Sequence, residues 1–133
     1  VTPQQPEEVP AKVEFTVGKE DYKIDGVLHP IDAKPYISPH DRIMVPVRYV
    51  AYALGAQDED LRWEEETKQI TISGNKPIVI DIKKKEMIMG SVINTLSEIK
   101  IIDGRTFAPV GEIGKAFGSK VTWDGESKTA TFN

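Results

Sequence analysis

Two tryptophans and two tyrosines are the residues of this chain best suited to recognising a ligand. Trp63 and Trp123 each stand one residue before a polar turn, on segments with the composition of strands. Aromatic rings exposed on a sheet can stack on sugar rings, and Tyr36 and Tyr52 are further candidates for such contacts. The tryptophans occupy equivalent places in two repeated segments, which favours the alternative that they close the core over a helix end.

Residues that bind transition metals are scarce in this chain. It contains two histidines, His29 and His40, and no cysteine. The histidines lie 11 residues apart (40−29) on a proline-rich segment, whereas copper or zinc sites are built from imidazole and thiolate ligands. We therefore expect no metal site and no cofactor, and we interpret both histidines as surface residues.

Acidic residues form two dense groups, Asp58-Glu59-Asp60 and Glu64-Glu65-Glu66. Their carboxylates would attract Ca²⁺, but the groups lack the alternating ligands and the turn glycine of a dedicated calcium loop. This favours a solvated acidic hairpin. No catalytic carboxylate pair stands out among the 21 acidic residues, and no serine lies in a nucleophile-elbow motif. The sequence therefore predicts no enzyme.

The composition is that of a globular domain, with 133 residues, of which 39% are hydrophobic and 29% charged. The net charge of −4 argues against a nucleic-acid-binding surface, which needs a basic face. No apolar run approaches the roughly 20 residues that cross a bilayer, so no membrane insertion is expected. Any secretion signal is expected to lie outside this chain.

The first twelve residues predict a linker, because Pro3, Pro6 and Pro10 alternate with Gln and Glu and offer little to bury. Order is expected to begin at Val13, where apolar and polar residues alternate with the period of a strand. We therefore divide the chain into a linker, residues 1–12, and a domain, residues 13–133.

The domain is built from a duplicated pattern. Arg42 matches Arg105 at a spacing of 63 residues (105−42), and two further pairs keep the same spacing: Pro46 with Pro109 and Gly55 with Gly118. Trp63 and Trp123 lie 60 residues apart (123−63). The region around Asp58-Glu59-Asp60 is therefore a three-residue insertion in the first copy, or its counterpart a deletion in the second. The copies cover about residues 13–73 and 77–132.

Each copy predicts a strand that runs into a short helix. Proline is expected in the first helical turn and glycine just past the helix end. Apolar residues between them fall at i, i+3, i+4 and i+7, which gives each helix one buried face. These residues are Val47, Val50, Ala51 and Leu54 in the first copy, and Val110, Ile113, Gly114 and Phe117 in the second. Because helices of about ten residues are unstable alone, each is expected to lie on a sheet made by its own copy.

The predicted order in each copy is strand, strand, extended segment, strand, helix, strand, strand. This indicates an α+β fold of two tandem repeats, each an antiparallel sheet packed on one short helix. We expect a pseudo-twofold arrangement of the two repeats within one domain.

Both copies resemble the repeat called the copper amine oxidase N-terminal domain-like or stalk domain, found in secreted and cell-envelope proteins of Gram-positive bacteria. The resemblance covers about residues 13–132. It departs from the usual pattern at Asp41, which replaces a glycine, and at Gly111, which stands opposite Arg48. The matching residues are Arg42, Val45, Pro46, Leu54, Gly55, Trp63, Glu64, Thr67 and Lys68 in the first copy, and Gly104, Arg105, Pro109, Phe117, Gly118, Trp123, Asp124, Ser127 and Lys128 in the second.

The resemblance implies an accessory domain, because the chemistry of the oxidase lies in a much larger domain that has no counterpart here. The expected function is a non-catalytic stalk or adhesion module that spaces or anchors a larger surface protein or enzyme, secreted or at the cell surface. The alternative is a carbohydrate-binding module for cell-wall or plant polysaccharide. The expected partners are such polysaccharides or other modules of the parent protein. Arg42 and Arg105 are expected to be structural residues that bond to turns or carbonyls.

Overall fold

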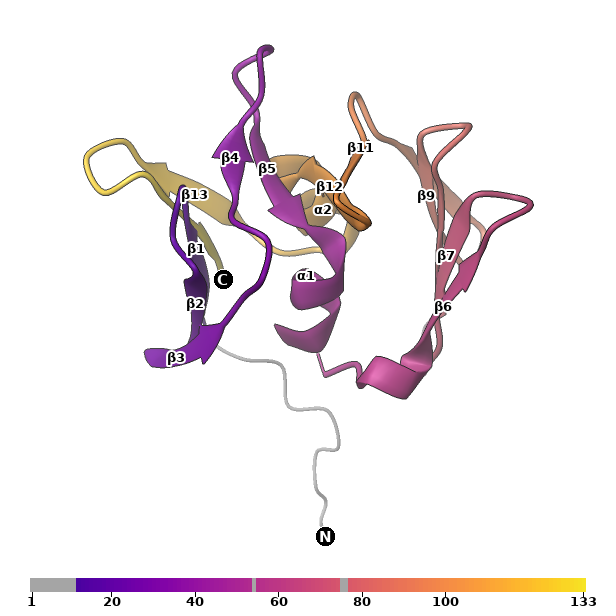
Figure 1. Cartoon of the computed structure of the whole chain (residues 1–133), viewed down its shortest axis with the longest axis horizontal. Coiled ribbons are helices and arrows are strands. Elements are labelled where there is room, and N and C mark those ends of the chain that lie inside the picture. Colours follow the sequence, from indigo (N-terminus) through magenta and orange to yellow (C-terminus); the bar gives the residue numbers. More distant parts are fainter. Residues whose placement is uncertain (1–11, 54, 75–76) are drawn as a thin grey trace, which may run out of the picture.

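The computed structural model describes residues 12–53, 55–74 and 77–133, and these form three antiparallel sheets and two short helices (Figure 1). One five-stranded sheet has the order β13 (Val121–Asp124), β14 (Thr129–Phe132), β1 (Val13–Thr16), β2 (Asp21–Ile24) and β3 (Val27–Pro30). The other has the order β10 (Val92–Thr95), β9 (Glu86–Met89), β8 (Ile78–Asp81), β7 (Gln69–Ile72) and β6 (Leu61–Glu64). The expected linker lies, except for Lys12, outside the described residues.

A four-stranded sheet and the helices lie between the two larger sheets, which occupy the left and right of Figure 1. This central sheet has the order β11 (Lys100–Ile102), β12 (Arg105–Pro109), β5 (Ile43–Pro46) and β4 (Tyr36–Ile37). The helices are α1 (Val47–Ala53) and α2 (Val110–Ala116), and a 3₁₀ turn, η1, covers Asp58–Asp60. The predicted α+β class is confirmed, with sheets dominating. No helix in the described part of the chain has the length and apolar character of a membrane span.

The larger sheets combine strands from both copies, so the expectation that each copy forms its own sheet was wrong. Strand β7 of the first copy pairs with β8 of the second, and β14 at the end of the second copy pairs with β1 at the start of the first. The connection between β7 and β8 is short, which favours pairing between these neighbours along the chain. Since β8 is then occupied by β7 and β9, β14 completes the sheet that begins with β1.

The two prolines of the repeated pattern end strands instead of opening helices. Pro46 is the last residue of β5, and Pro109 is the N-cap of α2, with φ −66° and ψ 130°. Each helix therefore begins one residue after its proline, whereas the proline was expected to be the first residue of the helix. Because the fixed φ of proline suits a strand as well as a helix, the backbone changes only its ψ angle at this junction.

Glycines end both helices as predicted. Gly118 has a φ of 77°, and the amide of Ser119 donates to the carbonyl of Gly114 at 2.8 Å. This is the bond of a Schellman motif, which requires the left-handed conformation that glycine adopts most easily. Gly55 follows α1 with a φ of 105°. Leu54, expected to be a core residue of the first helix, lies outside the described residues.

The core lies between the sheets and the helices. Its largest fully buried side chains include Phe15 of β1, Met44 of β5, Ile80 of β8 and Ile113 of α2. Phe117, the C-cap of α2, is partly buried and packs against this core. The core therefore ties strands of both copies to both helices.

Candidate functional site

Both tryptophans are exposed, so the interpretation that they close the core was wrong. Trp63 is 44% exposed and Trp123 is 45% exposed. They lie on β6 and β13, which are edge strands of the two larger sheets. Trp123 pairs with the buried Ala130 and so lies on the inner face of its sheet. Each tryptophan therefore lies at a sheet edge, with no neighbouring strand on one side.

The four candidate aromatics do not form a single surface. Trp63 and Trp123 belong to different sheets on opposite flanks of the molecule (Figure 1). Tyr36 packs edge-on against Phe107, with ring centroids 5.2 Å apart. Tyr52 donates a hydrogen bond to Asp58 at 2.6 Å. Any ligand platform must therefore be built around one tryptophan.

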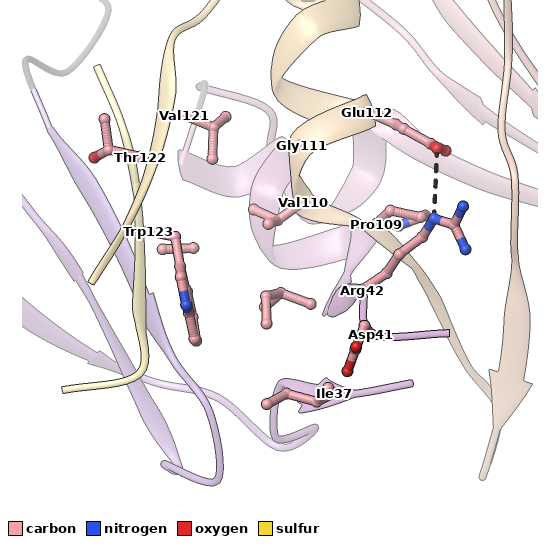
Figure 2. A pocket seen from close by; sticks show the side chains of 12 residues that line it. Ile37, Asp41, Arg42, Pro109, Val110, Gly111, Glu112, Val121, Thr122 and Trp123 are labelled. Atoms are coloured by element: carbon pink, nitrogen blue, oxygen red, sulfur yellow. Dashed lines mark ion pairs between the residues drawn. The ribbon is translucent and has the colours of Figure 1, made fainter. Parts of the chain in front are cut away.

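A groove of about 610 Å³ opens beside Trp123. Figure 2 shows the indole along one side, Val110 in the middle, and Asp41 and Arg42 on the opposite side. The groove is bounded by β13, by the junction of β12 with α2, and by the segment around β4 and β5. Most of its lining is apolar, with charged groups at one end. Its lining residues are Ile37, Asp41, Arg42, Ile43, Pro109, Val110, Gly111, Glu112, Val121, Thr122, Trp123 and Ala130.

Arg42 is held by carboxylates of the second copy. Its Nη1 atom donates to Glu98 at 3.3 Å, and its Nε atom lies 4.0 Å from Glu112. The hydroxyl of Ser38 also donates to Glu98, at 2.7 Å. The Ser38 hydrogen bond and the Arg42 guanidinium lower the pKa of Glu98. Arg42 therefore bridges the copies through side chains, whereas bonds to turns or carbonyls were expected.

Arg105 makes the corresponding contact in the other direction. Its guanidinium binds both carboxylate oxygens of Asp32, and the distance from Nε to Oδ1 is 3.1 Å. The hydroxyl of Tyr49 donates to the same oxygen at 2.7 Å. Together these donors lower the pKa of Asp32 from 3.8 to about 2. Both arginines of the repeated pattern therefore join one copy to the other.

We expect the Arg105–Asp32 pair to lose its contribution to stability in acid. Because the pKa of Asp32 is lower in the folded chain than in the unfolded chain, the contribution is complete above about pH 4 and disappears as the pH falls through about 2. Asp32→Asn removes this dependence. In urea unfolding at a series of pH values, the variant should lose less stability between pH 5 and pH 2 than the unmodified chain. Equal losses would contradict the assignment.

Asp41 replaces the usual glycine and keeps the left-handed backbone conformation of that position. Its φ is 64°, and its counterpart Gly104 has a φ of 77°. An aspartate tolerates this left-handed conformation better than most residues do. The substitution therefore adds a carboxylate to the groove while keeping the turn before Arg42.

The residues with metal-binding potential do not converge. The His29 ring packs near Tyr22, at a centroid distance of 5.6 Å, and the amide of His40 donates to Ser38 Oγ at 3.2 Å. Asp58 accepts bonds from Arg48 and Tyr52. In the described ranges, no group of three or more His, Cys, Asp or Glu residues is arranged to hold a metal ion.

Sequence reasoning missed most of the groove. It singled out Trp123, Arg42 and the departures at Asp41 and Gly111, but it did not identify Ile37 or Glu112 as neighbours of the tryptophan. Ile37 comes from β4 and Glu112 from α2. The signal that was available is the substitution of glycine for arginine at position 111, which removes a long side chain from one copy alone.

The fold and the groove describe a sheet-dominated domain with an exposed aromatic side chain beside an apolar hollow. The family model of the copper amine oxidase N-terminal domain matches the chain over residues 10–59 and 23–132. The chain belongs to this family, which is the non-catalytic N-terminal part of copper amine oxidases. No curated protein and no solved structure matched the chain.

The copper in the family name has no matching donor set in the described residues. Copper sites need several imidazole or sulfur ligands on one centre. The chain has two histidines and no cysteine. The ring of His29 packs near Tyr22, whereas the amide of His40 donates to Ser38. The residues present therefore do not fit a copper ion.

Proposed function

We propose that this chain is a non-catalytic module of a secreted or cell-surface protein of the Gram-positive envelope, which spaces or anchors a larger protein or enzyme. The observation that carries the proposal is the family match, which extends over residues 10–132 and belongs to an accessory domain. Its proposed partners are other modules of the parent protein. We propose no nucleic-acid partner and no insertion into a membrane.

We also propose that the two repeats are related by a pseudo-twofold axis. The strand orders support this arrangement. The strand order β3, β2, β1, β14, β13 in one sheet corresponds to the order β10, β9, β8, β7, β6 in the other. The central sheet pairs β5 with β12. The boundaries at residues 12 and 13 and between the repeats remain predictions.

Sedimentation with isolated Gram-positive cell walls tests the anchoring role. The purified chain is mixed with increasing amounts of insoluble wall material, and the fraction in the pellet is measured against an inert protein of similar charge. Saturable retention is expected, because an anchoring module must bind a component of the surface that it occupies. Complete recovery in the supernatant at every wall concentration would contradict anchoring.

A second candidate is a carbohydrate-binding module, and it is favoured by the exposure of Trp63 and Trp123, at 44% and 45%. Large aromatic side chains left in solvent are typical of surfaces that bind partners. The same sedimentation with cellulose, xylan, starch and purified peptidoglycan tests this function. Retention by at least one polysaccharide supports it, and retention by none of them contradicts it.

A further inference from the structure

The two equivalent tryptophans have different surroundings. The Nε1 atom of Trp63 donates to Glu65 at 2.9 Å, and Lys68 Nζ lies 6.0 Å from the centre of its ring. Trp63 is therefore held by its own hairpin. For Trp123, no hydrogen bond from Nε1 to any described residue is found, and the residue in the place of Glu65 is Gly125. The indole N–H of Trp123 is available to a ligand.

A second glycine leaves the helix beside Trp123 bare. Gly111 of α2 lines the groove, and a Cβ atom added there would meet nothing within 4 Å. Its counterpart on α1 is Arg48, whose guanidinium donates to Tyr52 at 3.0 Å and to Asp58 at 2.8 Å. The side of α1 that corresponds to the groove is therefore occupied by an ion pair. The two indoles are equally exposed, at 44% and 45%, but the glycines at positions 111 and 125 leave Trp123 without the neighbouring polar side chains that the first copy has.

The groove has the size and the lining of a small-molecule site. Its volume of about 610 Å³ lies within the roughly 300–1,000 Å³ of ordinary ligand pockets. Its apolar side chains suit the C–H face of a sugar ring. Figure 2 shows the indole on one side of the hollow and Asp41 and Arg42 on the other. A ring stacked on Trp123 would thus direct its hydroxyl groups toward charged side chains that accept and donate hydrogen bonds.

The charges around this groove disfavour anionic ligands. Arg42 carries the positive charge at its rim, and it is already paired with Glu98 and Glu112. Asp41 adds a further carboxylate to the lining, for which no ion pair is found within the described residues. Carboxylates therefore outnumber the guanidinium around the groove. Uronates and phosphate-bearing polymers would be repelled, whereas neutral hydroxyl groups would find acceptors.

We propose that the groove beside Trp123 binds a neutral pyranose unit of a polysaccharide, with one face of the sugar ring on the indole. The corresponding surface at Trp63 takes no part in this binding. The inference rests on the carbohydrate-binding function proposed above and deepens it, because it names one site and one class of sugar. The unpaired indole N–H and the bare side of α2 support the choice of Trp123, and the excess of carboxylates supports a neutral ligand.

Isothermal titration of the full chain tests this site with four soluble hexasaccharides: cellohexaose, xylohexaose, chitohexaose and hexagalacturonate. We expect saturable binding of at least one of the first three, and binding of the anionic hexagalacturonate at least about tenfold weaker. Trp123→Ala and Gly111→Arg should each weaken the binding about tenfold or more, as truncation or blocking of an aromatic contact does. Trp63→Ala should bind like the unmodified chain. Thermal unfolding followed by circular dichroism verifies that each variant is folded.

The outcomes separate this site from the general function. Loss of binding in Trp63→Ala with full binding in Trp123→Ala would overturn the groove assignment and leave a carbohydrate-binding module that uses the other copy. Tightest binding of hexagalacturonate would overturn the neutral class of ligand. If the chain bound neither the soluble hexasaccharides nor any of the insoluble polysaccharides, both the site and the carbohydrate-binding function would be rejected.

Discussion

Phe15→Ala is expected to destabilise the chain by about 3–5 kcal/mol, the range observed when a buried phenylalanine is truncated. Phe15 is fully buried, at 0% exposure. Its ring stacks on Tyr22 at 5.1 Å and meets the edge of Phe132 at 6.0 Å. Tyr22 belongs to the first copy and Phe132 to the end of the second, so the cavity would weaken the junction between them. Urea unfolding measures the loss as a lower transition midpoint.

Leu28→Ala is the matched control for this change. Leu28 lies on β3 of the same sheet and is 58% exposed. A surface truncation of this kind changes the free energy of unfolding by no more than about 0.5 kcal/mol. Equal losses of stability in the two variants would show that Phe15 is not at the centre of a packed core.

Gly114→Ala is expected to destabilise the chain by about 1–3 kcal/mol, as overpacking of a well-packed contact does. A Cβ atom at this position would lie 2.2 Å from Cγ2 of Val121 and 3.5 Å from Cε2 of Phe132. Val121 is β-branched, so its methyl group has few alternative positions. The helix α2 would have to move away from β13. This cost exceeds the roughly 1 kcal/mol that alanine gains over glycine inside a helix.

Gly111→Ala lies on the same helix and supplies the control. No atom lies within 4 Å of the added Cβ, so the variant should gain up to about 1 kcal/mol from helix propensity. Thermal and urea unfolding of the two variants should therefore shift in opposite directions. A Gly114→Ala variant as stable as Gly111→Ala would contradict the close contact between α2 and β13. The double variant Gly114→Ala, Val121→Ala should recover part of the loss.

Local features of the fold were predictable because they depend on residues close together in the chain. Alternation at Val13 predicted β1. Gly55 and Gly118 predicted the helix ends. The helix starts were predicted one residue too early, at the prolines, because the φ angle of proline fits both a strand end and a helix start.

The exposure of the tryptophans was not predictable from the repeated pattern. Equivalence between Trp63 and Trp123 shows that each hairpin keeps its shape, but it does not show that both lie on edge strands. The difference between the tryptophans was nevertheless visible in the sequence, as Arg48 opposite Gly111 and Glu65 opposite Gly125. The consequence of these substitutions became clear only when the groove and its opposite wall were known.

The sequence by itself indicated the repeated pattern, most of the strands, the two helices with their glycine ends, and the family. These follow from local backbone preferences and from the period of apolar residues. Only the tertiary structure decided which copy completes each sheet and which aromatic ring faces a hollow. Pairing between β1 and β14, the bonds of Arg42 and Arg105, and the approach of Ile37 to Trp123 all join segments distant in the chain. Such contacts depend on the packing of the whole domain, because local backbone preferences do not determine which distant segments come together.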